Sequence, residues 1–222
     1  QCVTPPHYGG GRVGALCPYA YCAGDPVNCV DPDGRDMCSL LEPQGAGGMG
    51  HMAMLIQKPD QKWYLYSKNG TTSCKGFSGP NSTDKGDNIG TGKIVTDPDT
   101  GEKYEVGYDD PQDFINSDDN KDSEGNILYS EGFVIESSKS EDDAARNAMI
   151  EELNKGYYLL ESNCAYTVQK GLEAAGRSSG HFDLGTDNGI QSLLIPNDRF
   201  RMIVRENEGK IIRPINQKMP KK

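Results

Sequence analysis

Apolar residues recur along the chain with two different periods, and these periods predict strands and helices in a mixed order. Short apolar runs predict strands, because buried strands are typically this short. The expected strands lie at 51–57, 62–68, 92–96, 103–107, 130–137, 157–160 and at either 200–204 or 210–213. Helical spacing predicts two helices, one at about 141–154 and one at 163–175. The expected fold class is therefore α+β, with a small antiparallel sheet packed on helices.

Two long stretches without such periodicity set the expected domain organisation. Residues 1–48 are rich in glycine, proline and cysteine, and we expect an irregular segment there. Residues 69–126 are polar throughout and too long for an ordinary connection. We therefore expect them to form an acidic insertion, or lid, within a domain that spans 49–222.

The charge of the chain is unevenly distributed. The net charge is −10 over 222 residues, and 95–143 hold 16 acidic side chains against three basic ones. Residues 199–222 hold eight basic and two acidic side chains, and are expected to be solvated or to complement the insertion. The acidic middle argues against a nucleic-acid partner. No apolar run is long enough for a transmembrane segment, and residues 1–6 do not form a signal peptide as they stand.

Seven cysteines leave the redox state open. Five of them fall within the first 38 residues. Six could pair in an oxidising compartment and leave Cys164 free, or most could be reduced thiols. Their spacing does not match a zinc site, and no cofactor is expected.

Cys164 stands where a strand-like run gives way to a helical one. Ser162 and Asn163 are good N-cap residues, so the thiol is expected in the first turn of a helix, where the helix dipole favours a thiolate. His51 begins an apolar strand upstream. A cysteine on a helix and a histidine on a strand are the two groups that a thiol hydrolase needs, with Asn163 and the backbone N–H of Cys164 as an oxyanion hole. The alternative is a small buried cysteine and an unrelated surface histidine.

The segments around these two residues resemble a known family. They are G-H-M-A-M-L-I (50–56), W-Y-L-Y-S-K-N-G (63–70) and Y-Y-L-L-E-S-N-C-A-Y-T-V-Q-K-G-L-E-A-A-G (157–176). Together they resemble the circularly permuted papain-like thiol hydrolases, which include relatives of lecithin retinol acyltransferase and bacterial cell-wall amidase-like proteins. In that group the histidine strand precedes the cysteine helix, and this chain has the same order.

The resemblance implies a chemistry and a set of roles. It implies a papain-like fold in permuted order over 49–222, and an acyl-cysteine intermediate on Cys164, with His51 as general base and then acid. The implied substrate is a peptide, peptidoglycan or lipid-like acyl compound with an amide, ester or thioester bond. The family places the group that orients the imidazole on the strand after the histidine strand. In this chain the candidates are Ser67 and Asn69, and Ser67 is the one that we assign.

A second resemblance covers residues 18–36. A tyrosine-rich segment with two turns, Gly24-Asp25-Pro26 and Asp31-Pro32-Asp33-Gly34, resembles the motif that closes the core module of RHS (YD-repeat) proteins. In those proteins a variable toxin or enzyme domain follows. The resemblance implies an effector context and a secreted or cell-envelope location in a bacterium. No pattern indicates the oligomeric state.

The insertion also offers a weaker calcium candidate. Residues 120–131 match the spacing of an EF-hand loop, with oxygen ligands from Asn120, Asp122, Glu124 and Glu131. The flanks are not helical, so a turn leading into a strand is favoured and no metal site is assigned. If the insertion were the working surface, the chain would be a non-catalytic binding module on a papain-like scaffold. His181 is either a substrate contact or, as we favour, an exposed loop residue.

Overall fold

The computed structural model describes residues 35–69, 93–155, 157, 162–180 and 195–215. The chain divides into two units between Gly34 and Arg35, and all of the described residues belong to the second unit. Several expectations lie outside the described residues. They concern the RHS-like stretch up to residue 34, His181, most of the strand at 157–160, and Cys2, Cys17, Cys22, Cys29 and Cys74.

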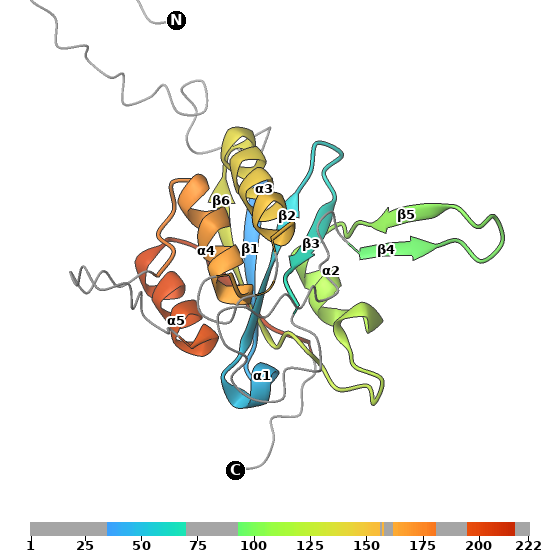
Figure 1. The fold of residues 1–222 in the computed structure, drawn as a ribbon, viewed down its shortest axis with the longest axis horizontal. Coiled ribbons are helices and arrows are strands. Elements are labelled where there is room, and N and C mark those ends of the chain that lie inside the picture. The colour runs from blue at the N-terminus through green and yellow to red at the C-terminus, as the bar shows by residue number, and fades with distance from the viewer. Residues whose placement is uncertain (1–34, 70–92, 156, 158–161, 181–194, 216–222) are drawn as a thin grey trace, which may run out of the picture. The chain divides into compact units, whose positions relative to one another are not determined.

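The centre of this unit is a five-stranded antiparallel sheet with the order β3-β2-β1-β6-β7 (Figure 1). The strands are β1 (Arg35–Glu42), β2 (His51–Gln57), β3 (Trp63–Ser67), β6 (Glu131–Ser137) and β7 (Lys210–Ile212). The middle strand β1 pairs with β2 on one side and with β6 on the other, and its register sets Glu42 opposite His51.

Helices cover both faces of this sheet. The helices are α1 (Gly45–Gly48), α2 (Pro111–Asn116), α3 (Lys139–Leu153), α4 (Cys164–Ala174) and α5 (Pro196–Glu206), with a 3-10 turn η2 (Asp118–Asn120). Helices α3, α4 and α5 bury their apolar side chains on one face, and α2 covers the other. The α+β class with a small antiparallel sheet is therefore confirmed.

The two-sided cover explains why β2 has a continuous apolar sequence. Successive side chains of a strand point to opposite faces, so a strand that is buried on both sides has no polar alternation. Met52 and Met54 belong to the core beneath α3–α5, whereas Ala53 and Leu55 belong to the core beneath α2.

The insertion contains regular structure where it is described. A hairpin of β4 (Lys93–Thr96) and β5 (Lys103–Val106) is followed by α2 and η2. The two short strands expected there are confirmed. An ion pair between Lys58 and Glu105 and a bridge between Trp63 and Tyr108 join this part to the β2–β3 hairpin.

One expectation about the elements is wrong, and the structure decides between the two alternatives for the last strand. Residues 35–42 are not part of an irregular segment, because they form the central strand β1, and the chain divides after Gly34 rather than near residue 48. The strand considered at 200–204 lies inside α5, where Phe200 and Ile203 face the core at helical spacing. The alternative at 210–213 is confirmed as β7. None of the described helices is long and apolar enough to cross a bilayer.

Candidate active site

Cys164 is the first residue of α4, as the sequence predicts. Asn163 caps this helix, and its Oδ1 accepts a hydrogen bond from the N–H of Tyr166 at 2.8 Å. The thiol is 4% exposed. Its sulfur accepts hydrogen bonds from the backbone N–H groups of Met52 and Ala165. Backbone donors and a helix N-terminus both favour the thiolate over the thiol.

His51 begins β2, the strand on which α4 packs, and it hydrogen-bonds Cys164. Burial opposes ionisation of the Cys164 thiol, but the imidazolium of His51, the hydrogen bond between them and the backbone donors outweigh it, so the pKa of Cys164 is lowered. Burial likewise opposes protonation of His51. The charge of Cys164, their hydrogen bond, and Glu42 outweigh this effect, so the pKa of His51 is raised. The two shifts favour a thiolate–imidazolium pair.

Ser67, at the end of β3, contacts the far side of the same imidazole. Its Oγ lies 3.1 Å from Nε2 of His51 and donates to Oδ1 of Asn69 at 2.9 Å. Because a hydroxyl has one proton, Oγ must accept from Nε2–H and from the hydroxyl of Tyr129, which lies 3.2 Å away. With Nε2 engaged in this way, Nδ1 is the ring nitrogen that is left to interact with Cys164. The structure thus brings Cys164, His51 and Ser67 together, with Asn69 also hydrogen-bonded to His51.

Sequence reasoning missed two side chains of this site. Glu42 lies opposite His51 in the β1–β2 pair. Its position depends on the pairing of β1, a strand that the sequence pattern does not predict. Burial raises the pKa of Glu42, while the charge of His51 acts to lower it. Tyr129 is buried beside His51, and the centroids of the two rings are 6.0 Å apart. The sequence around Tyr129 contains no pattern that predicts its position next to His51.

The candidate calcium ligands do not form a site. Asn120 is fully buried and clamps Tyr129: its Oδ1 accepts from the N–H of Tyr129 and its Nδ2 donates to the carbonyl oxygen. Asp122 accepts from the backbone of Glu124 and Asn126 in a turn. Glu131 lies on β6 and pairs with Arg213. The EF-hand interpretation is therefore wrong, and the turn is confirmed. Among the described residues, no group of three or more His, Cys, Asp or Glu could hold a metal ion.

The cap of α4 bears on the expected oxyanion hole. Because Oδ1 of Asn163 is bound to Tyr166, the side chain is held in place at the start of the helix beside Cys164. In an asparagine amide, Nδ2 is the group that can donate a hydrogen bond.

Cys38 provides a contrast within the same unit. It lies on β1 in the core, it is a free thiol, and burial raises its pKa. A buried thiol without a cationic partner is inert, whereas Cys164 has its imidazole.

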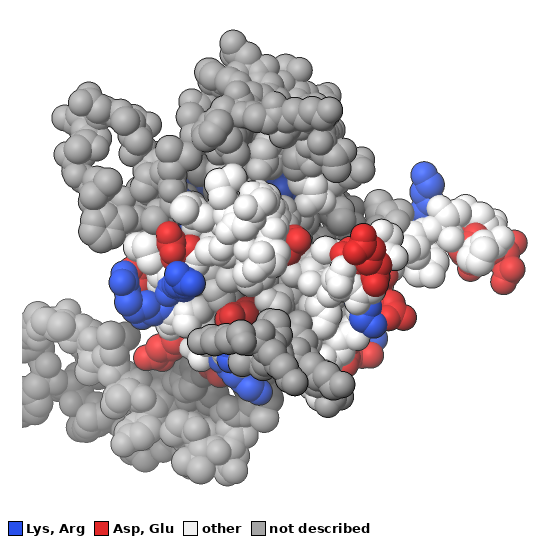
Figure 2. Space-filling view, turned by 90° about the horizontal axis from the view of Figure 1, so that it is seen from below, with Lys and Arg blue, Asp and Glu red and all other residues white. Residues whose placement is uncertain are grey.

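The surface and the comparisons give no independent indication of function. On the face shown in Figure 2, acidic and basic side chains of the described residues are interspersed, and they form no continuous basic patch there. Comparison with protein-family models, curated proteins and solved structures gave no match.

Proposed function

We propose that this chain is a Cys–His thiol hydrolase or acyltransferase, with a papain-like domain in permuted order. The observation that carries the proposal is the placement of Cys164 at the N-terminus of α4 beside His51 at the start of β2, the strand on which that helix packs. The interaction between the two groups lowers the pKa of the thiol and raises the pKa of the imidazole. A thiolate at a helix N-terminus beside a charged imidazole is the arrangement that nucleophilic catalysis by cysteine requires.

The reaction would proceed in two steps on these groups. The Cys164 sulfur attacks the carbonyl carbon, and the Nδ1–H of His51 protonates the departing amine, alcohol or thiol. His51, now neutral, takes a proton from water or from an acceptor molecule, which attacks the acyl-cysteine and releases the thiolate. Ser67 holds the imidazole through Nε2 during both transfers. The N–H of Cys164 and Nδ2 of Asn163 are the donors proposed for the developing oxyanion.

The substrate class rests on resemblance rather than on geometry. The likeness to cell-wall amidase-like proteins and to the RHS core motif favours a peptidoglycan peptide or a protein of a host or rival cell. In this proposal the chain acts as a secreted or cell-envelope effector of a bacterium. A lipid-like acyl substrate is the other candidate within the same chemistry.

A generic activated ester tests the chemistry without the natural substrate. Incubation with p-nitrophenyl acetate is expected to release p-nitrophenolate and to leave an acetyl group on Cys164, detected by mass spectrometry of the peptide. The Cys164→Ser and His51→Ala variants should lose both signals, because one lacks the thiolate and the other its partner.

The outcome also separates the two classes of function. A folded parent protein whose Cys164 is neither acetylated nor alkylated faster than a free thiol would overturn the proposal. The chain would then be a binding module, and the insertion would be its working surface. Among the described residues, the candidate calcium ligands of the insertion do not form a group that could hold a metal ion, so the binding-module alternative has no calcium site there.

A further inference from the structure

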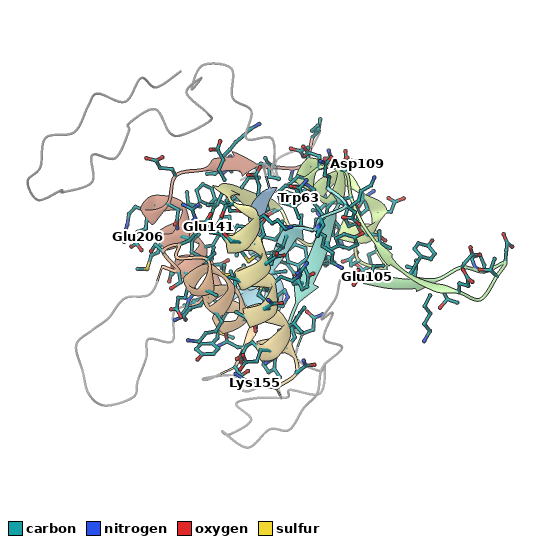
Figure 3. The ribbon with its side chains drawn as sticks, turned by 90° about the horizontal axis from the view of Figure 1, so that it is seen from above. Trp63, Glu105, Asp109, Glu141, Lys155 and Glu206 are labelled. Carbon is teal, nitrogen blue, oxygen red and sulfur yellow. The ribbon has the colours of Figure 1, made fainter. Side chains whose placement is uncertain are left out.

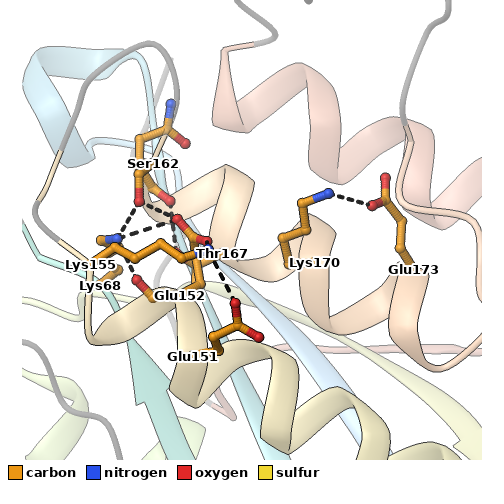
Figure 4. A network of polar contacts seen from close by, with 9 residues as sticks. Lys68, Glu151, Glu152, Lys155, Ser162, Thr167, Lys170 and Glu173 are labelled. Atoms are coloured by element: carbon orange, nitrogen blue, oxygen red, sulfur yellow. Dashed lines mark hydrogen bonds and ion pairs between the residues drawn. The ribbon is translucent and has the colours of Figure 1, made fainter. Parts of the chain in front are cut away.

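A buried cluster of charges lies beside the candidate site and has no part in the two chemical steps. Lys68 follows β3 directly, and its side chain is fully buried. Its Nζ donates to the carbonyl oxygen of Glu152 at 2.6 Å and to the hydroxyl of Ser162, and lies 3.5 Å from Oε1 of Glu152 (Figure 4). The hydroxyl of Ser162 in turn donates to Oε1 of Glu152.

The cluster joins three elements at one point. Lys68 comes from the end of β3, Glu152 from the last turn of α3, and Ser162 from the segment that leads into α4. Figure 3 shows that α3 runs from Glu141 at one end to Lys155 just past the other, which is the end that holds the cluster. Glu152 is 2% exposed, and its Oε2 accepts from Lys155 at 2.9 Å.

The residues of the cluster lie next to residues of the candidate active site along the chain. Lys68 lies between Ser67 and Asn69, both of which hydrogen-bond His51. Ser162 lies two residues before Cys164. One hydrogen bond, from Lys68 to Ser162, therefore connects the segment that holds the imidazole to the segment that begins the cysteine helix.

A full charge is costly to bury, and a neutral contact could join the same elements. The hydrogen-bonding capacity of the ammonium group is filled at this position. It has three N–H donors, and three acceptor atoms of Glu152 and Ser162 surround it. Such a fully hydrogen-bonded cluster permits one arrangement of its partners and penalises any other, because a shift would leave a buried charge unpaired.

We propose that Lys68, Glu152 and Ser162 are positioning residues that fix Cys164 against His51. They act through the segments that carry the pair rather than by contact with the reacting atoms. The inference rests on the proposed function, because it assigns the cluster a role only if the Cys164–His51 pair is the working site.

The test is the pH dependence of alkylation of Cys164 by iodoacetamide in the full-length protein. Trypsin cleavage after Lys155 and Lys170, or after Arg177 in a variant that lacks Lys170, releases a peptide whose only cysteine is Cys164. The modification of Cys164 is therefore measured separately from that of the other cysteines. In the parent protein, alkylation should reach half its maximal rate below pH 9.0, the ordinary thiol pKa. This first result depends on the proposed function alone.

Two variants then test the cluster without leaving an unpaired buried charge. Ser162→Ala removes the connecting hydroxyl, and the Lys68→Met/Glu152→Met double variant removes both charges together. Each should shift the alkylation midpoint to higher pH and slow the reaction at pH 7 by about tenfold or more, because a small misplacement of a reacting group has effects of this size. Thermal unfolding of each variant verifies that it is folded.

The matched control is Lys170→Met, which removes an exposed lysine of α4 that pairs with Glu173 at 3.1 Å. Its alkylation profile should match that of the parent. Folded Ser162→Ala and double variants with an unchanged midpoint would overturn the positioning role while the low midpoint of the parent still supports the proposed function. A parent midpoint near that of an ordinary thiol would overturn both.

Discussion

At the scale of single residues, the site depends on how one imidazole is held. Hydroxyl and amide groups surround the far side of His51, and the only described carboxylate that acts on it is that of Glu42. A neutral hydroxyl orients the ring but stabilises its charged form less than a carboxylate would. The charge of the imidazolium is therefore balanced mainly by Cys164 itself, with Glu42 as the second contributor.

The first prediction concerns Ser67. Ser67→Ala removes the acceptor for Nε2–H of His51, and alkylation of Cys164 at pH 7 should slow by about three- to tenfold, the value of one neutral hydrogen bond. Ser39→Ala is the matched control, because Ser39 is also a buried serine of the sheet but its hydroxyl has no partner among the described residues. Its alkylation rate should stay at the parent value. Equal rates for the two variants would remove Ser67 from the site.

The second prediction concerns Glu42 and pH. Activity towards p-nitrophenyl acetate should rise through an apparent pKa below the ordinary 9.0 of a thiol and fall through one above the ordinary 6.5 of an imidazole. The negative charge of Glu42 raises the pKa of His51, so Glu42→Gln should move the alkaline limb to lower pH. Glu136→Gln, on exposed sheet surface, should leave the profile in place. An unchanged alkaline limb in Glu42→Gln would contradict the role given to this carboxylate.

The site residues differ in how far the sequence could reveal them. Cys164 and His51 carry local signals, namely a helix cap and the start of an apolar strand. Ser67 and Asn69 follow from the hairpin that the turn at Pro59-Asp60 predicts. Glu42 and Tyr129 depend on strand pairings and contacts between distant segments, which no local pattern encodes.

At the scale of elements, the turn between β1 and β2 determines the position of His51 at the start of β2. Gly50 has a φ of +96°, and a Cβ there would lie 2.5 Å from Oδ1 of Asn197 at the start of α5. Asn197 in turn donates through Nδ2 to the carbonyl oxygens of Pro43 and Gly48. Helix α5 therefore approaches the turn closely just before the histidine.

Two glycine variants separate close approach from backbone conformation. Gly47 also has a positive φ, +71°, but has open space around the position of a Cβ. Gly47→Ala should lower the free energy of unfolding by about 1–2 kcal/mol for the backbone alone. Gly50→Ala should cost more, by a further ~1–3 kcal/mol for the overlap with Asn197, measured by urea denaturation. If both variants lowered the free energy of unfolding equally, α5 would not be in close contact with this turn.

The elements that were predicted correctly share a property, and so do those that were missed. Strands β2 and β6 and helices α3 and α4 have long apolar patterns or clear caps, such as Ser138 and Glu141 at the start of α3. In β1, Arg35 and Asp36 precede a short apolar run, and a glycine-rich stretch precedes both, so the local pattern does not separate this strand from the irregular residues before it. In α5, the run Phe200–Val204 looks like a strand in isolation, and only the packing of Phe200 and Ile203 on the sheet reveals a helix.

At the scale of the whole molecule, the folded unit begins with β1. This strand lies between β2 and β6 and contributes Met37, Leu40 and Leu41 to the two cores. Removal of residues 1–34 should therefore leave a chain that unfolds cooperatively and retains alkylation of Cys164. Removal of residues 1–48 takes away the central strand and should give a chain without a cooperative transition. Both are measured by thermal denaturation followed by circular dichroism. A folded 49–222 chain would contradict the placement of β1.

The separation of Cys164 from its partners along the chain has a consequence for how reactivity arises. The imidazole belongs to β2, its orienting hydroxyl to β3, and the thiol to α4. In an unfolded chain these groups are apart, so Cys164 has only the reactivity of an ordinary cysteine. In the proposed function, docking of α4 on β2 creates the nucleophile, because it brings Cys164 to His51. In that proposal, folding is itself the event that activates the thiol.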